Sequence, residues 1–217
     1  ELLPFTQVSI AAPAAATQMY DVFAYNNAGV LALELLAWTN DTTRATALTT
    51  QDGVYVKTGA TTRLYLGSVR TVTASQFNDS AALRHVWNYF NRVSRTVQVL
   101  EGTASWTYTT NTFRQANAAA TNQLDIVVGV AEDAINATVQ ASAARNDTVG
   151  GGVALLVAIG YDSTSVASTA SVIGHVVTPV ANFGVNITAG IVHFPAVGRH
   201  VYVWLEKSGA TGTTTWI

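Results

Sequence analysis

Strict alternation of apolar and polar residues near the middle of the chain constrains the fold more than any other feature. From position 135 to 143 the odd positions are apolar and the even positions are polar. The apolar set is Ile135, Ala137, Val139, Ala141 and Ala143, and the polar set is Asn136, Thr138, Gln140 and Ser142. Because successive side chains of a strand point to opposite faces, this segment hides one face and exposes the other. It predicts a strand of an antiparallel sheet with one solvated side.

Similar short segments occur along the whole chain. Further strands are predicted at Tyr20–Tyr25, Leu31–Trp38, Val54–Lys57, Leu64–Val72, Thr96–Glu101, Ser105–Tyr108, Leu124–Val130, Val153–Tyr161, Ile187–Phe194 and Val201–Glu206. Turn-forming residues separate them, at Asn26-Asn27-Ala28-Gly29, Gln51-Asp52-Gly53, Lys57-Thr58-Gly59 and Gly150-Gly151-Gly152. Many short strands without regular helical segments between them predict an all-β fold. We expect an antiparallel β-sandwich, jelly-roll-like, with at most one short helix.

The local structure of two segments needs separate consideration. The connection at 131–134 suits a hairpin, which would pair the strand at 124–130 with the strand at 135–143. Between Asp79 and Arg92 a helix capped by Asp79 and Ser80 competes with a strand. The strand would place Leu83, His85, Trp87 and Tyr89 on one face. We favour the strand, because aromatic and β-branched residues crowd the second half of this segment.

The N-terminal stretch differs from the remainder of the chain. The alanine-rich run at 11–16 is interrupted by Pro13, so residues 1–19 are interpreted as an arm or linker. Residues 20–217 are expected to form a single β-sandwich domain. The first residue is Glu1 rather than Met, and we therefore expect the sequence to be part of a longer or processed chain.

Low charge is the main constraint from composition. Only 11% of the residues are charged, compared with about 25% in typical domains. The net charge is −2 and no cluster of Lys and Arg occurs, so nucleic acid is not an expected partner. No Cys is present, which excludes disulfides and thiolate metal sites. The longest apolar run, at 153–160, is much shorter than the roughly 20 residues that span a bilayer, so membrane insertion is not expected.

Catalytic motifs are absent from the sequence. It contains no nucleophile elbow, no zinc-binding H-E-x-x-H and no phosphate-binding loop. The histidines at 85, 175, 193 and 200 are isolated from one another, and each is interpreted as a packed or surface residue rather than a metal ligand. A glycosidase would need two converging carboxylates, for which the candidates are Glu34, Asp52, Glu101, Asp125 and the adjacent Glu132 and Asp133. We predict no enzyme activity, no catalytic residues, no metal and no cofactor.

The five tryptophans are the candidate sugar-binding residues, because a flat apolar ring can stack on a pyranose. Trp38, Trp87 and Trp204 lie within predicted strands and are expected in the core. Trp106 and Trp216 are flanked by Ser and Thr. These two are therefore the candidate glycan-contact residues, with edge packing or a contact between subunits as the alternative.

Seven segments spread along the chain carry a resemblance to a known family. They are Leu35–Arg44, Arg63–Thr71, Asp79–Ala82, Val86–Val93, Ser105–Thr110, Phe113–Asn117 and Gly212–Trp216. These segments resemble uncharacterised virion structural proteins of tailed bacteriophages, described as tail-fibre-like or head-fibre-like. The resemblance runs from about Tyr20 to the end of the chain. Family members often carry a longer N-terminal part, and none supplies catalytic residues to transfer to this sequence.

The resemblance implies a location in the virion, which is an extracellular particle. We expect a surface fibre, knob or decoration module that provides subunit contacts, with host attachment as a further role. The expected partners are other copies of the chain, as a homotrimer by analogy with fibre proteins, other virion proteins and a host surface glycan. The first alternative is a carbohydrate-binding receptor-recognition module of a tail fibre. The second is a glycan-degrading enzyme of the tailspike type, which the missing motifs disfavour.

Overall fold

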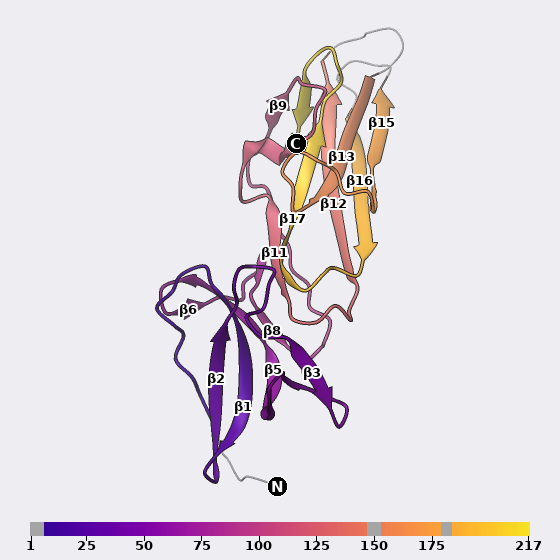
Figure 1. The fold of residues 1–217 in the computed structure, drawn as a ribbon. Helices are drawn as coiled ribbons and strands as arrows, with labels where there is room; N and C mark the ends of the chain where they lie inside the picture. The colour runs from indigo at the N-terminus through magenta and orange to yellow at the C-terminus, as the bar shows by residue number, and fades with distance from the viewer. Residues whose placement is uncertain (1–6, 147–152, 179–183) are drawn as a thin grey trace. The chain divides into compact units, whose positions relative to one another are not determined.

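The computed structural model describes residues 7–146, 153–178 and 184–217. The described chain is all-β, as predicted, and most of its strand pairs are antiparallel, while one short pair is parallel (Figure 1). The one helical element in this described part is η1 (Ala116–Ala118), a three-residue 3-10 turn. None of the described segments forms a helix with the length and hydropathy needed to cross a membrane. The jelly-roll connectivity stays a prediction.

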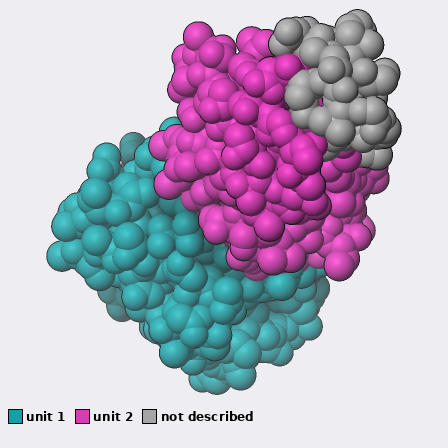
Figure 2. All heavy atoms as spheres, turned by 90° about the horizontal axis from the view of Figure 1, so that it is seen from above, with its two compact units in different colours: residues 1–97, 125–131, 196–199 teal, residues 98–124, 132–195, 200–217 magenta. Residues whose placement is uncertain are grey.

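Contacts within the chain divide it into two compact units, where the sequence predicted a single domain for residues 20–217. Unit 1 comprises residues 1–97, 125–131 and 196–199, and unit 2 comprises residues 98–124, 132–195 and 200–217. Figure 2 shows the two units in different colours. Each unit is therefore built from segments that are distant in the sequence.

Unit 1 is organised around one antiparallel sheet with the strand order β2-β1-β5-β4-β3. Strands β6 and β8 also pair with β5, and β7 pairs in parallel with β11 (Gln123–Val128), whose residues 125–128 belong to this unit. The other strands of unit 1 are β1 (Met19–Asn27), β2 (Val30–Ala37), β3 (Leu48–Gln51), β4 (Val54–Lys57), β5 (Ala60–Thr73), β6 (Gln76–Phe77), β7 (Leu83–Arg84) and β8 (Val86–Asn88).

Turn chemistry sets the two hairpins of unit 1. Strands β1 and β2 are joined at Ala28 and Gly29, and strands β3 and β4 are joined at Asp52 and Gly53. All four residues have positive φ, from 51° to 88°. Two successive residues with positive φ form the tight turn that matches the right-handed twist of paired strands. The predicted turns at these positions are confirmed.

Unit 2 contains two sheets that pack face to face. One has the order β14-β16-β12-β18-β9, and the other contains β15-β13-β17 with β10 paired to β17. The strands are β9 (Trp106–Tyr108), β10 (Arg114–Gln115), β12 (Ile135–Arg145), β13 (Val153–Tyr161), β14 (Ser171–Val172), β15 (Gly174–Thr178), β16 (Val185–His193), β17 (Gly198–Lys207) and β18 (Thr214–Trp216). The core between the sheets joins Ala141 and Ile187 of the first to Leu155 and Val157 of the second. This layering is that of a β-sandwich.

Most of the predicted strands are present. The bounds of β4 and β13 are those predicted, and β7 and β8 bear out the strand interpretation for residues 83–84 and 86–88 of the 79–92 segment. The strand predicted at Thr96–Glu101 is wrong, because these residues form no ladder and Leu100 is 82% exposed. Alternation alone does not make a strand when no neighbouring edge pairs with it. The predicted turn at residues 150–152 lies outside the described residues.

The predicted hairpin between the strand at 124–130 and the strand at 135–143 is wrong. Strand β12 pairs with β16 and β18, whereas β11 pairs with β7 and lies in a different sheet. The burial patterns give the physical reason. β11 is buried at every position from Asp125 to Val128, as in a strand covered on both faces, while β12 alternates.

Candidate functional site

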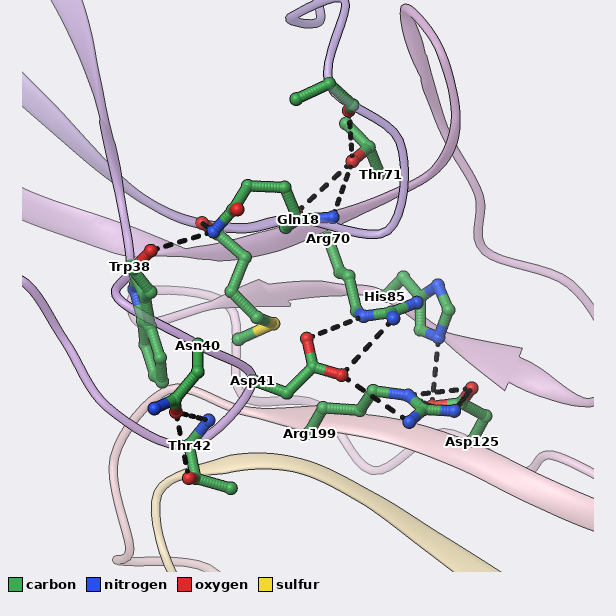
Figure 3. A network of polar contacts seen from close by, with 12 residues as sticks. Gln18, Trp38, Asn40, Asp41, Thr42, Arg70, Thr71, His85, Asp125 and Arg199 are labelled. Carbon is green, nitrogen blue, oxygen red and sulfur yellow. Dashed lines mark hydrogen bonds and ion pairs between the residues drawn. The ribbon is translucent and has the colours of Figure 1, made fainter.

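Four charged residues of this weakly charged protein form a chain of ion pairs in unit 1 (Figure 3). Arg70 donates to both carboxylate oxygens of Asp41, at 3.1 and 3.3 Å. Arg199 lies 3.5 Å from the same carboxylate and donates to Asp125 at 2.7 and 2.9 Å. Nε2 of His85 lies 3.1 Å from Asp125, without the alignment of a hydrogen bond. Positive and negative groups thus alternate along the chain of contacts.

The environment of Asp125 explains its ionisation. Its side chain is 8% exposed, and burial alone would raise its pKa. The nearby nitrogen groups of His85 and Arg199 outweigh burial and lower the pKa to about 2. Asp125 is therefore a carboxylate at neutral pH, held between two nitrogen groups. This geometry links separate segments of the chain through ion pairs.

A second buried network lies between β1 and β5 of unit 1. Arg44 donates to Asp21 at 2.8 Å, and Ser68 donates to the other oxygen of Asp21 at 2.7 Å. Since Ser68 has one proton and gives it to Asp21, the Tyr65 hydroxyl donates to Ser68, at 2.6 Å. Arg44 also donates to the carbonyl of Gly129. Burial raises the pKa of Asp21 despite the neighbouring Arg44.

In unit 2 the fully buried Glu206 is the centre of a third network. Trp106 donates from its indole nitrogen at 2.6 Å, Arg114 donates at 2.7 Å, and the backbone N–H of Asn117 donates at 3.2 Å. Burial raises the pKa of Glu206, and the donors oppose this effect. The Arg114 guanidinium also lies 4.0 Å from the ring centre of Tyr108. Every oxygen of Glu206 is occupied, so this carboxyl group supports the core.

The exposure expected for Trp106 and Trp216 is not what the structure shows. Trp106 is 9% exposed and Trp216 is fully buried, and both belong to the core between the sheets of unit 2. The flanking Ser and Thr residues point to the outer face, while the tryptophans alternate inward. Neither ring therefore offers a face to a sugar. Trp38 is buried as predicted, whereas Trp87 and Trp204 are only partly buried.

Glu34 and Glu101, like Asp125, are carboxylates named from the sequence that have nitrogen partners in the structure. Glu34 is paired with Lys57 at 2.6 Å and Arg63 at 2.7 Å. Glu101 accepts from Asn122, and this hydrogen bond with those of Thr103 lowers its pKa to about 2. Asp52, Glu132 and Asp133 are exposed. Within the described residues, no group of three or more His, Asp or Glu is arranged to hold a metal ion.

Two of the histidines that are isolated in the sequence share one cluster in unit 2. The Tyr161 ring lies 4.8 Å from the ring of His193 and 4.8 Å from that of His200. His193 bonds the Tyr202 hydroxyl at 2.8 Å, and His200 bonds Asp162 at 2.8 Å. Burial and the nearby His200 lower the pKa of His193. The side chain of His175 lies outside the described residues.

The outer face of the five-stranded sheet in unit 2 is a regular surface of uncharged side chains. Cross-strand partners on this face include Asn136 with Val192, Gln140 with Thr188, and Ser142 with Asn186. We call it the neutral face; it consists of Thr107, Asn136, Thr138, Gln140, Ser142, Ala144, Val172, Asn186, Thr188, Gly190, Val192 and Thr215. None of these residues is charged, and all are exposed or half-buried.

The alternation at 135–143 predicted four of the twelve residues of the neutral face. It missed the contribution of β16 and the ion pairs of Asp41, Asp125 and Arg199, because no short-range pattern reports pairings between residues 74 or more positions apart. Comparison of the chain with protein-family models, curated proteins and solved structures gave no match.

Proposed function

We propose that this protein is a structural module of a tailed-bacteriophage virion that assembles with copies of itself through the neutral face. The observation that carries the proposal is the absence of charge from the twelve residues of that face. Surfaces that stay solvated as monomers normally mix both signs of charge. A face without charge can be buried against an identical face without like-charge repulsion and without desolvating ions.

The composition of the neutral face supports contact with a protein surface. Its Ser, Thr, Asn and Gln side chains carry both donors and acceptors, so the polar groups of two copies can form hydrogen bonds with one another. The Ser142 hydroxyl already bonds the Asn186 amide oxygen at 2.5 Å, which fixes both side chains before any contact forms. Val172 and Val192 are 72% and 66% exposed and add apolar area. A pre-ordered surface loses less side-chain entropy on association.

The resemblance to tail-fibre-like and head-fibre-like proteins supports a virion location, and the homotrimer follows by analogy with fibre proteins. In a trimer each copy would turn its neutral face toward the common axis. Subunit contact and mechanical stability are the tasks that such a module performs. The buried positions of Trp106 and Trp216 remove these two residues as support for a sugar-binding function.

Light scattering after size exclusion tests the self-association. We expect the protein to form multimers, and Thr138→Lys with Gln140→Lys to convert them to monomers, because each copy brings two positive charges to the contact. The matched control is Thr49→Lys with Gln51→Lys, an equally spaced and exposed pair on β3, which is expected to leave the multimer intact. A monomeric parent protein at about 100 μM, or equal behaviour of the two variants, would overturn the proposal.

The virion location has its own test. Antibody raised against the chain is expected to label particles of the phage that encodes it, as seen by electron microscopy. Particles that contain no copy of the chain by mass spectrometry contradict the location and leave the self-association result standing.

A further inference from the structure

Strand β2 ends the sheet of unit 1 and has a strand partner on one side only. It pairs with β1 over all eight of its residues, without a register shift, and no described segment pairs with its other side. The other strands that end a sheet have two to five residues in the described part of the chain. β2 is therefore the longest free edge that the described residues form.

The β2 edge lacks the features that usually protect a free edge. Proteins protect such edges because their unpaired N–H and C=O groups can pair with another chain. The sequence of β2, Val-Leu-Ala-Leu-Glu-Leu-Leu-Ala, contains no proline and no lysine, and its pairing with β1 has no bulge. Its one charged residue, Glu34, is balanced by Lys57 at 2.6 Å and Arg63 at 2.7 Å. An edge of this kind is suited to accept a further strand.

The two faces of β2 differ in what they contact. Leu36 packs against the buried core cluster of unit 1 that contains Phe23. Because side chains alternate along a strand, Leu31, Leu33 and Leu35 lie on the opposite face. All three of these leucines are partly exposed. A strand added at the free edge would cover part of their apolar surface.

We propose that β2 pairs antiparallel with β2 of a second copy, about a two-fold axis that passes through the sheet at Leu33. A continuous sheet keeps paired side chains on one face, which limits the pairing to registers that set odd positions opposite odd ones. The register centred on Leu33 sets Leu31 opposite the second copy's Leu35 and Glu34 opposite its Ala32. Leucine then meets leucine, and no like charges are opposed. This self-complementarity identifies the partner as a second copy.

The pairing adds a second contact to the self-association proposed above, and it rests on that proposal because the partner is again a copy of the chain. Two paired strands alone are marginally stable, so one β2 contact does not hold two monomers together. A multimer formed through the neutral face carries several β2 edges, and pairing several at once strengthens the contact. We therefore expect β2 to join multimers into larger assemblies.

Disulfide cross-linking tests the register directly, because the chain contains no cysteine of its own. Leu33→Cys sets two cysteines opposite each other, with about 4.5–5.5 Å between their Cα atoms, a separation that a disulfide accepts. We expect mild oxidation to give a covalent dimer on a denaturing gel. Leu31→Cys is the matched control, because the register keeps its two copies four positions apart, and it should cross-link at least tenfold more slowly. A mixture of Leu31→Cys and Leu35→Cys should give a heterodimer.

The outcomes separate this inference from the neutral-face contact. Multimers without a Leu33→Cys cross-link, or equal cross-linking of Leu33→Cys and Leu31→Cys, overturn the β2 pairing and leave the neutral-face contact standing. A Leu33→Cys cross-link in a protein that scatters light as a monomer keeps the β2 pairing and contradicts the neutral-face contact.

Hydrogen exchange provides a measurement that needs no change in β2. The N–H groups on the free side of β2 are expected to exchange at least tenfold more slowly in assemblies of the parent protein than in monomers of Thr138→Lys with Gln140→Lys. Equal exchange rates in the two proteins would refute the pairing. Protection of these groups without the Leu33→Cys cross-link would assign the edge to a different partner and would also refute it.

Discussion

Arg199 donates hydrogen bonds to both carboxylate oxygens of Asp125, although the two residues lie 74 positions apart. Asp125 begins the part of β11 that belongs to unit 1, and Arg199 ends the second short segment of that unit. The backbone N–H of Arg199 also donates to the carbonyl of Asp41, at 2.8 Å, and that of Asp125 donates to the carbonyl of Ala82, at 3.0 Å. The ion pair therefore fastens two short segments to the main body of unit 1.

Loss of this ion pair should destabilise the protein strongly. Arg199→Met leaves the buried carboxylate of Asp125 without its bidentate partner, and we expect a loss of about 3 kcal/mol in the free energy of unfolding. Lys57→Met is the control, because its partner Glu34 is more exposed than Asp125 and keeps its pair with Arg63, so the loss is at most about 1 kcal/mol. Urea unfolding of both variants measures the difference. Equal losses would show that the Arg199 pair contributes no more than the Lys57–Glu34 pair.

The stability contributed by Asp125 should disappear in acid. Its pKa is about 2 in the folded protein and about 4 in an unfolded chain. The folded form therefore binds its proton less readily, so the contribution is complete above about pH 4 and is lost as the pH falls toward about 2. Its size is about 2 kcal/mol.

Asp125→Asn isolates this effect, because the variant has no carboxyl group to titrate at that position. The difference in unfolding free energy between the parent protein and Asp125→Asn should shrink as the pH is lowered from 5 to 2. A difference that stays constant over this range would contradict the depressed pKa. Glu206 and Asp21 have raised pKa values and titrate alike in both proteins, so they cancel in the comparison.

Two buried tryptophans of the same core should respond differently to replacement by phenylalanine. Trp106 donates to the buried Glu206, whereas the indole N–H of Trp216 has no hydrogen-bond partner among the described residues. Trp106→Phe thus removes volume and a hydrogen bond to a charged group, which adds about 1.5–3 kcal/mol to the loss. Trp216→Phe removes volume alone. Thermal unfolding compares them, and a larger loss for Trp216→Phe would argue against the Glu206 contact.

Gly129 is expected to tolerate no side chain. A Cβ atom at this position would overlap the ring of Trp87 and the hydroxyl of Tyr65. We expect Gly129→Ala to cost about 1–3 kcal/mol and to shift the tryptophan fluorescence, since Trp87 must move. Gly102→Ala is the control, because nothing lies within 4 Å of a Cβ there. Unchanged stability and fluorescence in Gly129→Ala would contradict the close contact between Gly129 and the Trp87 ring.

Local features of the fold were predictable. The alternation at 135–143 predicted which residues of β12 are buried: Ala137, Ala141 and Ala143 are buried, and Asn136, Thr138 and Gln140 are exposed. The turns with positive φ at Asp52 and Gly53 were predictable for the same reason. Both depend on the conformational preferences of adjacent residues, which the sequence displays directly.

The candidate sites were less predictable. The sequence indicated a strand through Trp87 and Tyr89 but placed Trp87 in the core, and it named Trp106 and Trp216 for sugar contact. Whether a ring on a strand is covered depends on what packs over that face. For Trp106 the covering group includes Glu206, which lies 100 positions away.

The sequence by itself determined that this chain is all-β, where most of its strands and turns lie, and that its surface is poor in charge. Only the tertiary structure decided that β11 pairs with β7 and not with β12, that the chain forms two units, and which aromatic rings stay exposed. The reason is that alternation and turn preferences act between neighbouring residues. The backbone hydrogen bonds that join strands are the same for every sequence, so the choice of partner depends on packing across the whole chain.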